Sequence, residues 1–205
     1  MALKKEERYK YFKSKKQMVL SLIIFGILIY LFIYLGSLDY QKDVDDNKKF
    51  VQDHKIVDTN NLYKYANHTD IYSLLTNKND AIILFGHTRS KWIKEYSEIV
   101  NKVAKDVGIK EIYYYDFLED REQRNGTYEA ILELLDTYVT YNDLDMPDIF
   151  APTLVIIKNK EIIYFDDQTG IRKGNTSPDI YWNDYQKGLF EQELKTVFNE
   201  YNKEV

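Results

Sequence analysis

The stretch AIILFGHTRSKWIKEYSEIVNKVAKDV, residues 81–107, decides the fold of this chain. It opens with an apolar run at residues 81–85, which is typical of a buried strand. Apolar side chains then recur every three or four residues, the period of an amphipathic helix. These positions are Ile93, Tyr96, Val100, Val103 and Val107. The stretch therefore predicts a strand that turns directly into a helix, which Gly108 ends.

The segments on either side of this unit predict further strands and helices. Residues 62–66 alternate enough to form an edge strand. A short helix follows, with Thr69 and Asp70 able to cap it. Its apolar face consists of Ile71, Leu74 and Leu75. Residues 112–117 predict a strand parallel to residues 81–85, because a helix joins the two by a right-handed crossover.

The C-terminal half predicts the rest of the sheet and its cover. A charged loop at residues 119–124 precedes a helix that is apolar on one side, at Ile131, Leu134, Leu135 and Tyr138. Residues 153–158 and 161–165 predict a β-hairpin around an Asn159-Lys160 turn. A final helix at about residues 185–201 carries apolar side chains at helical spacing and covers the sheet. These elements predict an α/β fold.

Two segments of the chain resemble the thioredoxin superfamily. In that family a strand ending in Phe-Gly or Phe-Trp precedes a Cys-x-x-Cys at the start of a helix, and here Ser90-Lys91-Trp92-Ile93 fills that slot. The second segment, FAPTLVIIKNKEII at residues 150–163, resembles the family's cis-proline segment. The resemblance implies a thioredoxin-like fold, a central mixed sheet flanked by helices, and a groove beside the proline. By pattern the chain is similar to bacteriocin-transport accessory proteins of Gram-positive bacteria.

The chemistry of that superfamily has no nucleophile in this chain, because the chain contains no cysteine. Thiol–disulfide exchange needs a thiolate and a second, resolving thiol. A serine hydroxyl has a far higher pKa than a thiol, and a helix dipole alone does not make it a useful nucleophile. The sequence therefore excludes thiol–disulfide exchange, and we expect no cofactor. The groove remains, and its backbone can take an extended peptide by strand addition.

The resemblance places six residues at the groove: His87, Ser90, Trp92, Ala151, Pro152 and Thr153. Ser90 has two interpretations, a helix N-cap or a nucleophile that pairs with His87 in a hydrolase-like enzyme. Trp92 also has two: an exposed contact residue for a partner, or a packing residue near Tyr181 and Trp182. Ile93 is most simply part of the core.

Metal and phosphate sites are not indicated. The three histidines, His54, His68 and His87, lack the spacing of metal ligands. Asp143-Leu144-Asp145 continues to Met146 and Pro147 and not to the glycine of a calcium loop. The chain also has no glycine-rich phosphate loop, so we expect no metal.

The N-terminal residues have the pattern of a membrane anchor. Residues 1–17 form a basic tail with a surplus of five positive charges, which leaves a net charge of about −10 for the remaining chain. Residues 18–38 carry no charge and are long enough to cross a hydrocarbon core of about 30 Å. The positive-inside rule then places the N-terminus in the cytoplasm and the rest outside. Residues 39–55 predict a polar spacer that adds little to the core, and residues 56–205 predict one domain.

Residues 18–38 have two alternative interpretations, a cleaved signal peptide and a buried core helix. A signal peptide has an apolar core of about 7–15 residues and a small-x-small cleavage site, which Tyr34-Leu35-Gly36-Ser37 fits poorly. A core helix of a soluble protein would need a polar face, and this segment has none. We therefore expect a single-pass signal anchor in the cell membrane.

Three kinds of function follow. The first is a redox-inactive accessory factor that binds an extracytoplasmic protein or peptide at the groove. The second is a hydrolase-like enzyme that uses Ser90 and His87, which predicts serine-selective labelling. The third is a structural subunit of a membrane complex. The acidic balance outside the basic tail argues against nucleic acid as a partner.

Overall fold

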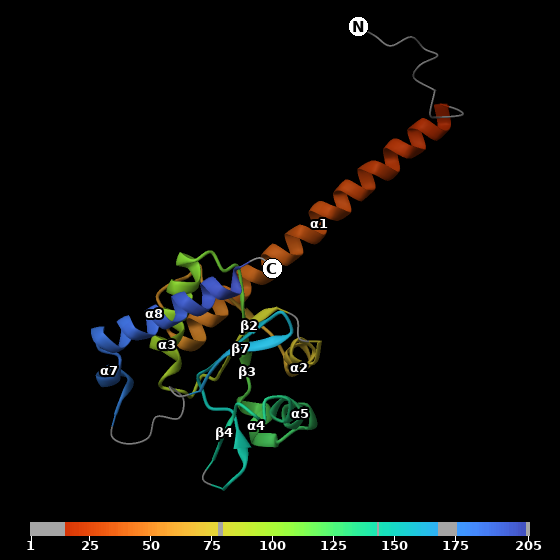
Figure 1. Ribbon diagram of the computed structural model, residues 1–205. Coiled ribbons are helices and arrows are strands. Elements are labelled where there is room, and N and C mark those ends of the chain that lie inside the picture. Colours follow the sequence, from red (N-terminus) through yellow and green to blue (C-terminus); the bar gives the residue numbers. More distant parts are fainter. Residues whose placement is uncertain (1–14, 78–79, 143, 168–175, 204–205) are drawn as a thin grey trace. The chain divides into compact units, whose positions relative to one another are not determined.

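The computed structural model describes residues 15–77, 80–142, 144–167 and 176–203 (Figure 1). It divides into two compact units, Met1–Asp45 and Asp46–Val205. Most of the predicted basic tail, and residues 168–175 between the predicted hairpin and the final helix, lie outside the described residues.

The first unit contains most of helix α1 (Lys15–His54). This helix is long and apolar enough to cross a membrane, and none of its most apolar window is buried. Its 40 residues would measure about 60 Å, roughly twice the thickness of a hydrocarbon core. Only part of α1 can therefore lie in a bilayer, and the uncharged residues 18–38 are the part whose composition suits it.

The last turns of α1, residues 46–54, belong to the second unit and correct the prediction of a spacer. Phe50 is fully buried and His54 is 4% exposed. Phe50 stacks on Tyr63 with 3.9 Å between ring centroids. The expectation that this segment adds little to the core is wrong, because Phe50, Val51 and His54 share one helical face inside a charged stretch.

A five-stranded mixed sheet forms the centre of the second unit, in the order β1-β3-β2-β6-β7. Strands β1, β3 and β2 are parallel, whereas β6 runs antiparallel to β2 and β7 antiparallel to β6. The predicted strands and the parallel pairing of residues 112–117 with 81–85 are confirmed. The strands are β1 (Tyr63–Tyr65), β2 (Ala81–Gly86), β3 (Ile112–Asp116), β6 (Thr153–Lys158) and β7 (Glu161–Asp166).

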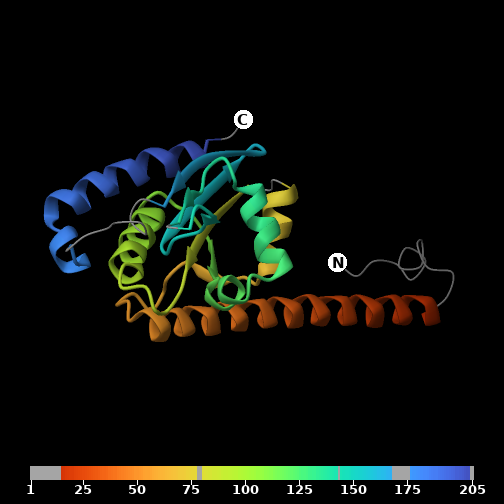
Figure 2. The ribbon, with the colours of Figure 1, turned by 90° about the horizontal axis from the view of Figure 1, so that it is seen from below.

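Two pairs of helices cover the two faces of this sheet, as Figure 2 shows. Helices α3 (Ile93–Asp106) and α8 (Asp184–Tyr201) pack together over one face. Helices α2 (His68–Asn77) and α5 (Gly126–Leu134) pack together over the other. The sheet therefore separates two hydrophobic clusters, and the α/β class with flanking helices is confirmed.

Short elements connect these layers. They are α4 (Leu118–Gln123), β4 (Thr140–Tyr141), β5 (Pro147–Asp148) and α7 (Pro178–Tyr181). The prediction of a charged loop at 119–124 is wrong, because Glu119 and Asp120 suit the first turn of α4 and the Gln123 amide donates to the Glu119 carboxylate at 3.0 Å.

Two further local predictions are corrected. The N-cap of α2 is Asn67, whose Oδ1 accepts the N–H groups of Thr69 and Asp70 at 2.8 and 3.0 Å, and of the two predicted residues Asp70 takes part, since its carboxylate accepts the N–H of Asn67 at 3.2 Å. Leu134 and Tyr138 were expected on the apolar side of their helix, yet each side chain is 42% exposed. Helix α5 ends at Leu134, so the helical period no longer places Tyr138 beside Leu135.

Two turns take the backbone conformation that the sequence indicates. Asn159 and Lys160 have φ of 52° and 68°, as a type I′ hairpin turn requires. Gly108 has φ of 84° and follows α3, as predicted. The pairing of β6 with β7 shifts register once, so that β7 has one extra residue, Ile163.

Candidate functional site

The turn after β2 meets the start of β6 through one side chain. The Ser90 hydroxyl donates to the carbonyl oxygen of Ala151 at 2.9 Å and accepts the N–H of Trp92 at 3.3 Å. The peptide bond between Ala151 and Pro152 is cis. The two segments that resemble the thioredoxin superfamily are therefore joined by a hydrogen bond.

Ser90 does not occupy the N-cap position that one interpretation assigned to it. Helix α3 begins at Ile93, and its N-cap residue, Trp92, makes no side-chain capping bond. Ser90 instead accepts an N–H in the turn before the helix. Its hydroxyl donates a hydrogen bond to a carbonyl oxygen. A serine nucleophile would instead have to donate to the imidazole of His87.

Gly86 allows α3 to begin close to the sheet. A Cβ atom at this position would lie 2.7 Å from Ile93 Cδ1 and 2.9 Å from Tyr114 Cε2. Real Cβ atoms do not approach other heavy atoms so closely. The absence of a side chain at Gly86 therefore lets Ile93, which is 2% exposed, pack directly against the end of β2.

The expected groove residues are less accessible than the resemblance implies. Ala151, Pro152 and Thr153 are buried, and the Thr153 hydroxyl donates to the carbonyl of Phe150 at 2.6 Å. Trp92 is half-buried, with its ring edge-on to Tyr181 at 5.6 Å between centroids. This contact favours the packing interpretation of Trp92. The freely exposed residues here are Thr88, Arg89 and Lys91.

His87 is enclosed behind this turn. Its ring lies 5.5 Å from that of Phe117, and its Nδ1 atom has no hydrogen-bond partner among the described residues. Burial, followed by the charges of Arg121 and Arg89, lowers the pKa of His87 to about 4. The imidazole is therefore neutral at pH 7.

Sequence reasoning missed a second buried imidazole close to His87. His54 lies at the end of α1, with its ring 4.5 Å from Phe50 and 5.0 Å from Tyr114 between centroids. Neither ring nitrogen of His54, nor the hydroxyl of Tyr114, has a hydrogen-bond partner in the described part of the chain. The spacing of His54 four residues after Phe50 was the available signal.

Charged groups surround the rings of Phe50, His54 and Tyr114. The Tyr65 hydroxyl donates to the Asp53 carboxylate at 2.6 Å, and the Lys49 ammonium lies 3.7 Å from the centroid of the Tyr65 ring. Burial raises the pKa of Asp116, at the carboxyl end of β3. Burial also lowers the pKa of His54 to about 4, which the nearby Asp53 carboxylate only partly opposes.

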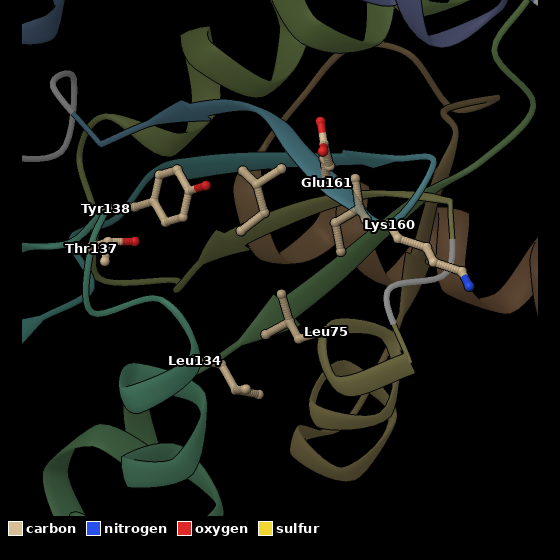
Figure 3. Close-up of a pocket in the computed structure, with 8 residues that line it drawn as sticks. Leu75, Leu134, Thr137, Tyr138, Lys160 and Glu161 are labelled. Carbon is tan, nitrogen blue, oxygen red and sulfur yellow. The ribbon is translucent and has the colours of Figure 1, made fainter.

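A cavity of about 430 Å³ lies apart from these residues, between the helices α2 and α5 and the β6–β7 turn (Figure 3). Leu75 and Leu134 form its lower side in this view, with Thr137 and Tyr138 at one end. Lys160 and Glu161 lie at the turn. None of the predicted groove residues lines this cavity. Its full lining is Leu75, Leu134, Thr137, Tyr138, Ile157, Lys160, Glu161 and Ile162.

The described residues contain no cluster of three or more His, Cys, Asp or Glu side chains that could hold a metal ion. Comparison of the chain with protein-family models finds no match. Comparison with curated proteins finds none either.

Proposed function

We propose that this protein is a redox-inactive, thioredoxin-like accessory factor that binds an extended segment of another protein outside the cell membrane. Residues 18–38 anchor it, with the N-terminus in the cytoplasm. The order of the strands in the sheet and their parallel and antiparallel pairing support the thioredoxin-like part of this proposal. The absence of cysteine leaves no thiolate for disulfide exchange.

The observation that carries the proposal is the hydrogen bond from Ser90 to Ala151. Ser90 stands in the slot of the superfamily's first cysteine, and Ala151 precedes the proline. The hydroxyl links the turn to the strand, a structural role that needs no deprotonation. A serine here is therefore consistent with a scaffold that holds a partner without chemistry on it.

The accessible part of the site is the turn itself. Arg89 and Lys91 are exposed on a domain that is otherwise acidic, although Arg89 also pairs with Glu122 at 2.6 Å. A partner segment can thus contact Lys91 and the edge of Trp92 at this turn.

Site-specific crosslinking tests the binding surface. A photo-reactive phenylalanine analogue replaces Trp92 in the full-length protein in its native membrane, and the same analogue replaces Lys195, an exposed residue of α8, as the control. We expect a discrete crosslinked partner from position 92 and not from position 195. Equal capture from both positions would contradict the proposal.

The orientation has its own test, because a cysteine-free chain accepts a single reporter thiol. Lys10→Cys and Lys195→Cys are treated with a membrane-impermeant maleimide on intact cells. We expect labelling of the Lys195→Cys protein alone, since residue 10 is in the basic tail. Labelling of the Lys10→Cys protein before lysis would reverse the topology.

A further inference from the structure

The end of α1, residues 46–54, is held on the edge of the sheet by polar contacts and by two buried rings. The Asp46 carboxylate accepts the N–H of Tyr65 at 3.1 Å, the carbonyl of Asn47 accepts the side-chain amide of Asn61 at 3.1 Å, and the Asp53 carboxylate accepts the Tyr65 hydroxyl at 2.6 Å. Phe50 and His54 supply the buried surface. The strand beneath them, β1, has three residues. This helix end is thus a small docked element at a sheet edge, the kind of element that opens locally.

His54 is the one titratable side chain of this helix end that is buried without a polar partner among the described residues. Its ring is enclosed by aromatic side chains, so a proton added there would be a charge in a poorly solvated place. The ionisable groups around it are Lys49 and Asp53 of α1, Tyr63 and Tyr65 of β1, Tyr114 and Asp116 of β3, and His87 after β2.

The neighbours of His54 offset only part of the cost of burying its charge. The Asp53 carboxylate favours a charged His54, but it also accepts the Tyr65 hydroxyl. His87 and Lys49 both oppose a positive charge at His54. His87 in turn faces Arg89, Arg121 and Glu122. A protonated His54 therefore gains more from water than from its surroundings in the docked state.

We propose that residues 46–54 form an acid-sensitive contact: proton uptake by His54 releases this helix end from the β1 edge, while the rest of the domain stays folded. The stretch of chain between the apolar segment and the sheet then lengthens, which extends the reach of the domain from its anchor. This inference does not depend on the identity of any partner.

The direction and size of the effect follow from proton linkage. The docked state holds His54 neutral down to about pH 4, whereas a released, solvated imidazole binds a proton near pH 6.5. Release is therefore favoured as the pH falls below 6.5. At pH 5 the ratio of released to docked molecules rises by roughly thirtyfold for His54 alone.

Thiol accessibility in the full-length protein, in lipid nanodiscs, measures this release. Val51→Cys places a reporter on the half-buried face of the helix end, and Lys48→Cys is an exposed reference on the same helix. A pyridyl disulfide reagent, which reacts at acidic pH, labels both proteins from pH 7.5 to 5. We expect the labelling rate at position 51 relative to position 48 to rise about thirtyfold.

Two His54 variants and one control test whether His54 causes the acid-induced increase in labelling at position 51. His54→Phe fits the aromatic surroundings and cannot titrate, and His54→Gln is a second neutral variant in case the first packs poorly. In either variant, the acid-induced rise in the labelling rate at position 51 relative to position 48 should be at least about tenfold smaller. His68→Gln, which changes a half-exposed histidine paired with Asp120, should leave the rise intact. A rise that persists in both His54 variants would overturn the proposal.

Tryptophan fluorescence distinguishes local release from unfolding. Trp182 is 5% exposed and packs on Tyr96 of α3 and Phe190 of α8. With Trp92→Phe, which leaves Trp182 as the single tryptophan, we expect the emission to stay constant over the pH range in which position 51 becomes reactive. Emission that changes together with the labelling rate, or labelling that does not change with pH, would refute the local release.

Discussion

The two edges of the sheet are protected in different ways. At the β1 edge, the N–H groups of Tyr63 and Tyr65 are accepted by side chains of Asn61 and Asp46, both at 3.1 Å, and the end of α1 covers the strand. At the β7 edge, the described residues supply no further strand. An extra residue and the exposed Glu161 protect that edge instead.

The difference shows how edge length sets the means of protection. A three-residue strand such as β1 gains little from its own ladder, so aromatic cover and side-chain acceptors must hold it in place. Five of the six residues of β7 pair with β6, Ile163 being the extra one, and only unwanted pairing on the outer side has to be prevented. Substitutions at the β1 edge should therefore change stability, and those at the β7 edge should change association.

Phe50→Ala should have the largest effect. Its ring is fully buried and stacks on Tyr63, so truncation should lower the free energy of unfolding by about 3–5 kcal/mol. Denaturant titration of the full-length protein in detergent measures this. Leu189→Ala, at a side chain that is 47% exposed, is the control and should change it by less than about 0.5 kcal/mol. Similar losses at both positions would mean that the helix end does not cover β1.

Asn61→Ala should come next. Asn61 is 4% exposed, and its removal leaves the N–H of Tyr63 buried without its acceptor. We expect a loss of about 1–3 kcal/mol in the same titration. Asn60→Ala, at the exposed neighbouring residue, should have almost no effect. An equal loss from both variants would point to the loop backbone and not to the edge hydrogen bond.

Tyr65→Phe and Tyr164→Phe compare the two edges directly. The Tyr65 hydroxyl bonds to Asp53 at 2.6 Å in a half-buried place, and its loss should lower the free energy of unfolding by about 1 kcal/mol. The Tyr164 hydroxyl bonds to Glu193 at 2.9 Å at the surface, and its loss should cost less than about 0.5 kcal/mol. A larger loss on the β7 side would reverse the comparison.

Glu161→Val should have the smallest effect on stability, within about 0.5 kcal/mol, because the side chain is exposed. It should instead increase self-association, since it removes a charge from an open strand edge. Sedimentation velocity at several protein concentrations measures this. Glu161→Lys, which keeps a charge at the edge, is the control and should sediment like the wild type.

Much of this fold could be predicted from hydrophobic periodicity. Residues 81–107 predicted both β2 and α3, and the Asn159-Lys160 turn predicted the hairpin, because each pattern depends on neighbours in sequence. The docked end of α1 could not be predicted with the same ease. Phe50 and His54 lie in a polar stretch, and their burial depends on β1 and also on β3, which lies far along the chain.

The site could be predicted only in part. The resemblance placed Ser90 and the Ala151-Pro152 segment at one groove, and a hydrogen bond joins Ser90 to Ala151. The sequence offered the packing of Trp92 near Tyr181 as one of two interpretations, and it did not predict that Pro152 and Thr153 would be buried. Accessibility depends on the packing of several elements at once, and local patterns carry no information on it.

Gly86 has a practical consequence for engineering this scaffold. Any side chain there would collide with Ile93 and Tyr114, so a combinatorial library built on the turn must leave this position unchanged. Thr88, Arg89 and Lys91 are exposed and can be diversified with little risk to folding. New specificities can therefore be selected a few residues from a position where any side chain would force the buried Ile93 or Tyr114 to shift.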